Sequence, residues 1–189
     1  RIGDANFERQ CLQFDGSGNG SQFGKLPSKS DPAKKLYSGT WYHVACTYDQ
    51  NTRTARIYLN GKMIDEVKDA GVAGPTADNG INLAMRALGM PEAYQFFIGK
   101  SYNDRRPLQG MIAEARVWRT ARTQEEIWKN MYRIVNPKEQ KDLIGYWKFN
   151  EGSGNDITDW SRVGNHGKAV ADVVWPDGIE IQEINKEEE

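Results

Sequence analysis

Cysteine and histidine are both scarce in this chain, which has two cysteines and two histidines among its 189 residues. Two cysteines are too few for a disulfide scaffold, although a single Cys11–Cys46 bridge stays open beside the alternative of two buried thiols. His43 and His166 lie far apart, which excludes an HExxH zinc helix. The sequence also holds no Gly-x-Ser-x-Gly elbow and no P-loop.

An excess of one charge sign and long apolar runs are also missing. Lys plus Arg number 25 and Asp plus Glu number 26, for a net charge of −1. Nucleic-acid-binding domains usually carry a clear basic surplus, so this balance argues against a nucleic-acid partner. No apolar run approaches the roughly 20 residues of a membrane helix, and we expect no membrane span in this chain. The chain opens without Met, and we interpret it as a piece of a longer protein.

Glycine and aromatic residues are plentiful, with 19 Gly, 6 Trp, 8 Tyr and 6 Phe. Many turns combined with many aromatics indicate a sheet-rich domain. The length suits one well-cored domain and is short for two. We therefore expect a single domain over residues 1–184, followed by a frayed tail at 185–189.

The clearest pattern covers residues 42–64. Alternating residues at 42–48 and again at 55–60 predict two strands, with a turn at 49–52 between them. Asn60-Gly61 is the strongest short hairpin signal, because both residues tolerate the positive φ of a type I′ turn. The return strand begins at Lys62, so three strands form an antiparallel meander.

Other elements follow from weaker patterns. Strands are expected at 11–14, 95–99, 111–118, 144–149 and 179–184, and a long loop at 69–93. Thr123 and Glu126 have the spacing of a capping box, and Ile127 and Met131 share a helical face. They predict one helix of about 10 residues, ending near Arg133. The fold class is therefore all-β with one short helix.

Five sequence runs together resemble a known family. They are GTWYHVACTYD (39–49), ARIYLNGK (55–62), FFIGK (96–100), GMIAEARVWRTARTQEEI (110–127) and LIGYWKFNEGSGNDITDWSRVGNHGKA (143–169). The chain resembles the laminin-G-like, concanavalin A-like jelly roll of pentraxin type, as in surface lipoproteins of glycan-degrading Gram-negative bacteria. The resemblance implies a two-sheet antiparallel β-sandwich that binds carbohydrate or protein, often with a structural calcium.

Three departures from the family pattern stand out. Ala113-Glu114 stands where Asp-Glu is usual, and Arg122 stands where Leu is usual. Residues 1–14 resemble strands from the middle of such a domain, so we expect the leading N-terminal strands to be missing. The alternative is that the strand at 143–149 takes the place of an N-terminal strand.

Sugar-binding sites pair an aromatic face with a few polar groups. The densest such cluster is the loop at 102–106, which offers an aromatic ring, an amide, a carboxylate and two guanidinium groups. A solvated loop is the alternative interpretation, and an ordinary packing role is the alternative for Tyr94 and Trp41. Trp160 and Trp175 lie near turns and receive no assignment. The predicted ligand-binding residues are Tyr102, Asn103, Asp104, Arg105, Arg106, Tyr94 and Trp41.

Metal binding and catalysis have weaker support. Calcium takes six to eight oxygen ligands, and no run has EF-hand spacing, so calcium is left open as the single cofactor. A retaining glycosidase needs two carboxylates about 5 Å apart. Glu114 instead has Arg116 as its same-face neighbour, and no predicted strand carries an acidic pair, so we expect no enzyme. The weak metal candidates are Asn103, Asp104, Asp156 and Asp159.

These observations, with the resemblance, predict a non-catalytic carbohydrate-binding module of a larger exported cell-surface protein. Its partners would be a glycan and a neighbouring domain of the same longer chain. The resemblance implies an extracellular or cell-surface location, as an outer-membrane lipoprotein. The first alternative is a protein-interaction or spacer module, and the second is a glycoside hydrolase on a glucanase-like jelly roll.

Overall fold

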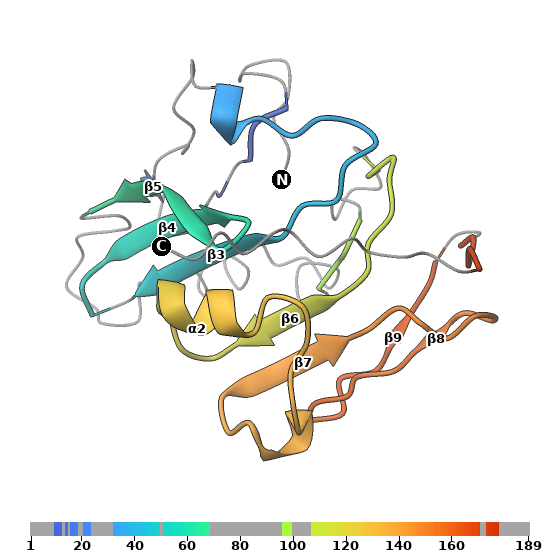
Figure 1. Cartoon of the computed structure of the whole chain (residues 1–189). Helices are drawn as coiled ribbons and strands as arrows, with labels where there is room; N and C mark the ends of the chain where they lie inside the picture. The colour runs from blue at the N-terminus through green and yellow to red at the C-terminus, as the bar shows by residue number, and fades with distance from the viewer. Residues whose placement is uncertain are drawn as a thin grey trace. The chain divides into compact units, whose positions relative to one another are not determined.

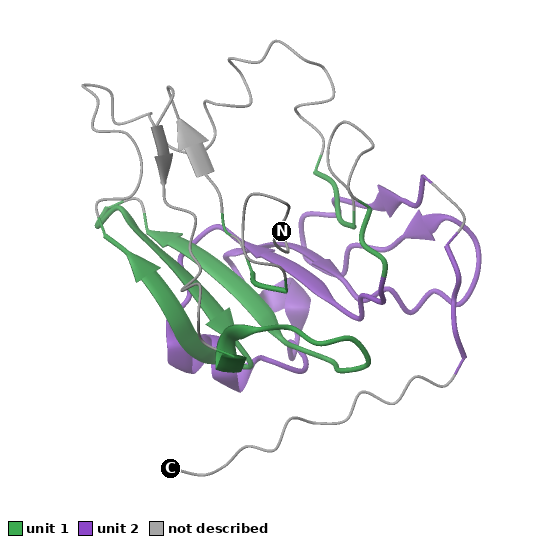
Figure 2. Cartoon of the chain, turned by 90° about the horizontal axis from the view of Figure 1, so that it is seen from above, with its two compact units in different colours: residues 1–109 green, residues 110–189 purple. Residues whose placement is uncertain are grey.

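The computed structural model divides the chain into two compact units, Arg1–Gln109 and Gly110–Glu189 (Figure 2). The structure describes residues 10–12, 14, 16–18, 21–23, 32–49, 51–68, 96–99, 107–170 and 173–177. Within this described part, no helix has the length and apolar character that crossing a membrane requires.

The first unit is built from antiparallel strands (Figure 1). The short strands β1 (Gly16–Gly18) and β2 (Ser21–Phe23) pair with each other, and a 3-10 turn covers Pro32–Lys34. The larger sheet has the order β3-β4-β5, from β3 (Val44–Asp49), β4 (Thr54–Leu59) and β5 (Lys62–Val67). The predicted meander is therefore confirmed.

Side chains in the two turns of the meander fix its register. Asp49 Oδ1 accepts hydrogen bonds from the backbone N–H groups of Asn51 (2.9 Å) and Thr52 (3.2 Å). At the second turn Asn60 and Gly61 have φ values of 50° and 77°, as a type I′ hairpin requires. Asn60 Oδ1 also accepts the His43 N–H at 3.0 Å, so this residue joins the turn to the segment before β3.

The core of the first unit forms on β4. Ala55, Ile57 and Leu59 are buried on one face, because alternate residues of a strand point the same way. Burying the Ile57 side chain stabilises the fold by about 1.5–3 kcal/mol. Tyr58 on the opposite face is also buried, so both faces of β4 are covered.

The second unit contains the helix and two further strand pairs. Strand β6 (Ala115–Trp118) pairs with β7 (Leu143–Trp147), and β8 (Asp156–Ile157) pairs with β9 (Gly167–Lys168), both antiparallel. A 3-10 turn covers Pro137–Glu139. Ile134, Leu143 and Tyr146 form the buried cluster, with Trp118 packed against it.

The helix α2 (Gln124–Lys129) begins as predicted and ends early. Thr123 Oγ1 accepts the Glu126 N–H, and Glu126 Oε2 accepts the Thr123 N–H, so the capping box is confirmed. The predicted end near Arg133 is wrong. The Asn130 side chain donates to Glu126 O at 2.8 Å, and the Arg116 guanidinium of β6 donates to the carbonyls of Asn130 and Met131. These donors satisfy the last carbonyls without another turn of helix.

Several predicted strands are shorter or absent in the described residues. Of the strand expected at 11–14, the described residues show isolated bridges at Cys11, which pairs with Lys35, and at Leu12, and residues 96–99 form no strand. Strand β6 begins at Ala115 because its partner β7 ends at Trp147, and Phe149 then turns the chain away with a φ of 55°. The strand at 179–184 and the loop at 69–93 lie outside the described residues.

The two cysteines form no disulfide with each other. Cys11 is buried, as expected, whereas Cys46 is exposed on β3, so its predicted burial is wrong. The alternation along β3 is present, but it buries Thr47 and exposes Val44 and Cys46. The register places Cys46 opposite Ile57 and Tyr48 opposite Ala55, and Tyr48 packs against the core. The pattern therefore predicted the core face, although Cys46 itself stays exposed on it.

The capping box gives a first testable prediction. Thr123→Ala removes the acceptor for the Glu126 N–H and should lower the free energy of unfolding by about 1 kcal/mol. Thr120→Ala is the matched control and should leave the free energy of unfolding nearly unchanged. Thr120 is exposed and makes no hydrogen bond within the described residues. Urea unfolding measures both variants, and equal losses would contradict the assigned role.

Candidate functional site

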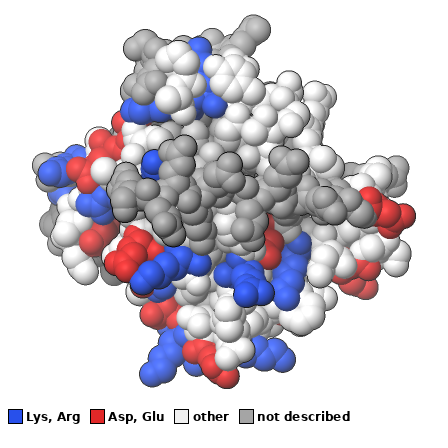
Figure 3. All heavy atoms as spheres, viewed as in Figure 1, with Lys and Arg blue, Asp and Glu red and all other residues white. Residues whose placement is uncertain are grey.

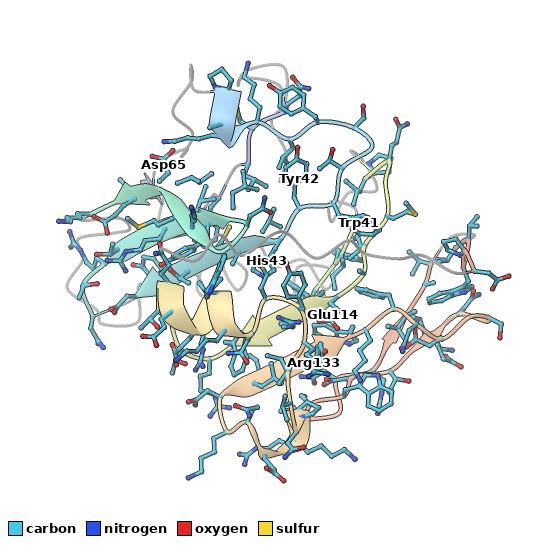
Figure 4. The ribbon with its side chains drawn as sticks, in the orientation of Figure 1. Trp41, Tyr42, His43, Asp65, Glu114 and Arg133 are labelled. Atoms are coloured by element: carbon cyan, nitrogen blue, oxygen red, sulfur yellow. The ribbon has the colours of Figure 1, made fainter. Side chains whose placement is uncertain are left out.

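Most of the predicted sugar-binding residues fall outside the described residues. Tyr94 and the loop at 102–106, which includes the metal candidates Asn103 and Asp104, lie there. Trp41 is described and half-buried, and it precedes Tyr42 and His43 on the segment that leads into β3 (Figure 4). The Tyr42 hydroxyl accepts the Tyr37 N–H at 3.1 Å, and its ring packs against the core of the first unit.

In the second unit, Asp159 lies at the centre of a polar turn and is only 4% exposed. Its Oδ1 accepts the N–H groups of Tyr146 and Ser161, both at 2.8 Å. Its Oδ2 accepts the Ser161 hydroxyl at 2.8 Å and the Asn165 N–H at 2.7 Å. A carboxylate offers about four lone-pair directions, and all of them are used. The geometry gives Asp159 the role of an internal acceptor that holds the turn together.

The same turn is tied to β7 by further hydrogen bonds. The Asn165 amide donates to Ile144 O at 2.8 Å, and the Trp147 indole donates to Asn165 O at 2.9 Å. Trp147 and Asp159 also form an isolated antiparallel bridge. His166 Nδ1 accepts the Asp159 N–H at 3.2 Å, so it serves the turn as an acceptor. The 159–166 segment is therefore anchored along the length of β7.

Two opposing effects set the acidity of Asp159. Burial, the larger single effect, raises its pKa, but the hydrogen bonds from Ser161, Tyr146 and Asn165 together outweigh burial. The pKa of Asp159 is thus lowered from its ordinary value of 3.8. The carboxyl group is ionised throughout the neutral range. The ionised form has only acceptor oxygens, as the four donors around it require.

The other described metal candidate, Asp156, is exposed on β8. It pairs across the strands with Lys168 of β9, at 3.6 Å between Oδ1 and Nζ. Nearby in sequence, Glu151 Oε1 accepts the Thr158 N–H at 2.9 Å. Among the described residues, no group of three or more His, Cys, Asp or Glu side chains is placed to hold a metal ion.

Trp160 and Lys148 lie together on the surface of the second unit. The Trp160 side chain is 38% exposed. The Lys148 ammonium lies 4.1 Å from the centre of the Trp160 ring and 5.7 Å from that of Tyr146. The Trp160 N–H donates to Tyr146 O at 2.8 Å. The sequence alone assigned no role to Trp160. Its place directly after Asp159, in a turn held by hydrogen bonds, is the feature that could have indicated an exposed ring on a fixed backbone.

Glu114 lies just before β6 (Figure 4), where it meets Arg116 and Tyr146. Its Oε2 contacts the Arg116 guanidinium, and its Oε1 accepts the Tyr146 hydroxyl at 2.9 Å. Burial and then the Glu114 hydrogen bond raise the pKa of Tyr146. The predicted same-face pairing of Glu114 with Arg116 is therefore present, and both Glu114 oxygens are engaged.

Charge is mixed on the visible surface. On the face drawn in Figure 3, Lys and Arg side chains lie interspersed with Asp and Glu side chains. Several pairs are close, including Lys129 with Glu125 at 2.6 Å and Arg122 with Glu126 at 2.8 Å. The described part of this face carries no single-sign field of the kind that steers nucleic acid.

Comparisons with known proteins give a family and two solved structures. The model of the concanavalin A-like lectin/glucanases superfamily matches residues 7–128. A protein of Bacteroides ovatus, provisionally named a carbohydrate-binding protein, is 22% identical over 83% of this chain and 42% of its own, with a TM-score of 0.49. An S-layer domain-containing protein of Clostridium thermocellum is 26% identical over 58% of this chain and 43% of its own, with a TM-score of 0.33.

This chain thus spans about two fifths of the length of either solved structure. No curated protein matches the sequence.

The buried carboxylate gives a second prediction. Asp159→Asn replaces one acceptor oxygen with a donor that faces N–H and O–H groups, and should cost about 3 kcal/mol of unfolding free energy at neutral pH. The matched control is Asp156→Asn at the exposed pair with Lys168, where the loss should be under about 0.5 kcal/mol.

The same comparison has a pH dependence. Because the pKa of Asp159 is lower in the folded chain than its ordinary value, its ionisation favours folding above about pH 4 and this contribution fades as the pH falls. The gap between wild type and Asp159→Asn in urea unfolding should therefore narrow at about pH 3. A gap that stays constant between the two pH values would contradict the assigned role of the carboxylate.

Proposed function

The chain belongs to the concanavalin A-like lectin/glucanase superfamily, and from this membership we propose that it is a non-catalytic carbohydrate-binding module of a larger exported protein. The fold class is the all-β, antiparallel sandwich of that superfamily, with one short helix in the described residues. The observation that carries the proposal is the family match over residues 7–128, which covers more than half of the 189-residue chain.

The binding site that we propose is the one expected from the sequence. Tyr102 stacks on the apolar face of a sugar ring, while its polar neighbours bond the ring hydroxyls. Trp41, half-buried before β3, and Tyr94 border the site. No covalent step is involved, and binding rests on one aromatic face and planar hydrogen-bonding groups. The polar neighbours are Asn103, Asp104, Arg105 and Arg106.

Calcium is not part of the proposed mechanism. Asp159 does not fit a calcium site, because four internal donors use its lone pairs, and Asp156 is exposed beside the Lys168 ammonium. Asn103 and Asp104 remain as the oxygen ligands that an ion in the 102–106 loop would take.

A hydrolase is the weaker proposal. A glycosidase acid needs a carboxyl group that is free to give its proton to the leaving oxygen. Glu114 has one oxygen against the Arg116 guanidinium and the other on the Tyr146 hydroxyl, which supports a structural role for this acid. We therefore keep the non-catalytic function.

A protein-interaction or spacer module is the second candidate, and exposed apolar side chains favour it. Val170 and Val174 of the second unit are 70% and 82% exposed. Such side chains suit packing against a neighbouring domain of the same longer chain. We further propose an extracellular or cell-surface location, as a lipoprotein of the outer membrane, which rests on the family resemblance alone.

A glycan-array screen of the purified chain tests the function. We expect at least one glycan to bind, and Tyr102→Ala to weaken that binding roughly tenfold or more. Tyr37→Ala is the matched control, since Tyr37 is another exposed tyrosine. Repeating the array in EDTA measures the contribution of a divalent cation.

A blank array from a folded chain would favour the interaction module. If a glycan binds wild type and Tyr102→Ala with equal affinity, the proposed location of the binding site at residue 102 is contradicted. Binding that is lost in EDTA would bring calcium into the site.

A further inference from the structure

We propose that Trp160 and Lys148 form a subsite for a sugar ring that carries a carboxylate, as in the uronic acid units of acidic polysaccharides. The inference rests on the proposed function, because it names a substrate class and adds a second contact point. Lys148 directly follows β7, and Trp160 directly follows Asp159 in its turn. Both lie far in sequence from the loop at 102–106.

Lys148 supplies the positive charge of the subsite. Its side chain is half-buried, with the ammonium over the Trp160 and Tyr146 rings at 4.1 and 5.7 Å. Within the described residues no carboxylate pairs with this ammonium. Aromatic faces neutralise a cation only in part. A half-buried lysine side chain whose ammonium has no anion in the described chain favours an anionic ligand.

Trp160 supplies the stacking face and a second donor. Trp160 is 38% exposed. The indole N–H makes no hydrogen bond with any described residue. Because the Lys148 ammonium lies over one face of the Trp160 ring, a sugar that stacks on that face displaces the ammonium toward the ring edge. The pair then presents one apolar surface with two donors at its border. An apolar ring face that bears acceptor oxygens is the complement of that surface.

The subsite is held rigid before any ligand arrives. The Trp160 backbone N–H donates to Tyr146 O, and the carboxylate of the preceding residue, Asp159, accepts four hydrogen bonds. A ligand therefore orders few side chains when it binds, which lowers the entropy loss. Fixed backbone on both sides of the ring distinguishes this Trp from one on a free surface loop.

A cationic Lys148 beside an aromatic Trp160 favours acidic over neutral sugars. A neutral ring would stack on Trp160 and meet Lys148 only through hydroxyls. A uronate adds a charge-assisted hydrogen bond from the ammonium to its carboxylate, which is about twice as strong as a neutral one. The preference should weaken with added salt, because the pair is solvent-accessible.

Nuclear magnetic resonance of the ¹⁵N-labelled full chain tests the proposal at the site itself. The six tryptophans give six indole N–H signals, and Trp160→Phe identifies one of them by its loss. The probes are oligosaccharides of galacturonate, glucuronate and mannuronate, each beside its neutral methyl ester. We expect the Trp160 signal to shift with at least one acid, and its methyl ester to bind about fivefold to tenfold more weakly.

Variants separate the charge from the ring. Lys148→Met keeps an apolar stem over Trp160 and should reduce the affinity for the acid to that for its ester, about fivefold to tenfold. Lys168→Met is the matched control and should leave the affinity unchanged, since Lys168 pairs with Asp156 on the surface of β9. Trp160→Ala should abolish the shift of the neighbouring resonances.

The failures are distinguishable. A Trp160 signal that stays fixed with every acid, or that moves equally with acid and ester, overturns the subsite. If other resonances shift in that case, the chain binds glycan elsewhere and the proposed function stands. If no resonance shifts with these probes and the glycan array is also blank, both proposals fall.

Discussion

The buried Asp159 carboxylate is the constraint on which most of the second unit depends. It draws the backbone of β7, the Ser161 turn and the Asn165 corner onto a single pair of oxygens. A buried charge is costly unless donors surround it. Here four donors surround the Asp159 carboxylate. Moving any of the segments that carry them would leave a buried charge with too few donors, so their positions are fixed relative to one another. The exposed ring of Trp160 is fixed as a consequence, because it follows Asp159 directly.

Arg116 acts in a similar way at the other side of β7. Its guanidinium contacts Glu114, lies 5.3 Å from the Tyr146 ring centre, and donates to carbonyls at the end of α2. One planar fork therefore joins a strand to the end of a helix, which a lysine with a point charge would not do. In both cases a polar side chain specifies the arrangement, while the apolar cluster around Leu143 and Tyr146 supplies burial.

Sequence reasoning succeeded where the determining contacts are local. The Asp49 turn, the Asn60-Gly61 hairpin and the Thr123 cap each depend on residues within a few positions of one another. It failed where a distant residue decides. The end of α2 depends on Arg116, and the start of β6 depends on where β7 leaves the ladder at Phe149. The Lys148–Trp160 pair has the same origin, since only the Asp159 turn brings the two segments together.

The role of Asp159 and the proposed ligand share one range of pH. Asp159 must be ionised to hold the turn, and its lowered pKa keeps it so above about pH 4. The carboxyl group of a uronic acid must be ionised to pair with Lys148, and carboxyl groups of this type titrate in the same acidic range. The rigid ring, the cation and the anion are therefore all present together from weakly acidic to neutral pH. At lower pH both carboxyl groups become protonated. Protonation of Asp159 weakens the turn that holds Trp160, and protonation of the uronic acid removes the charge that pairs with Lys148.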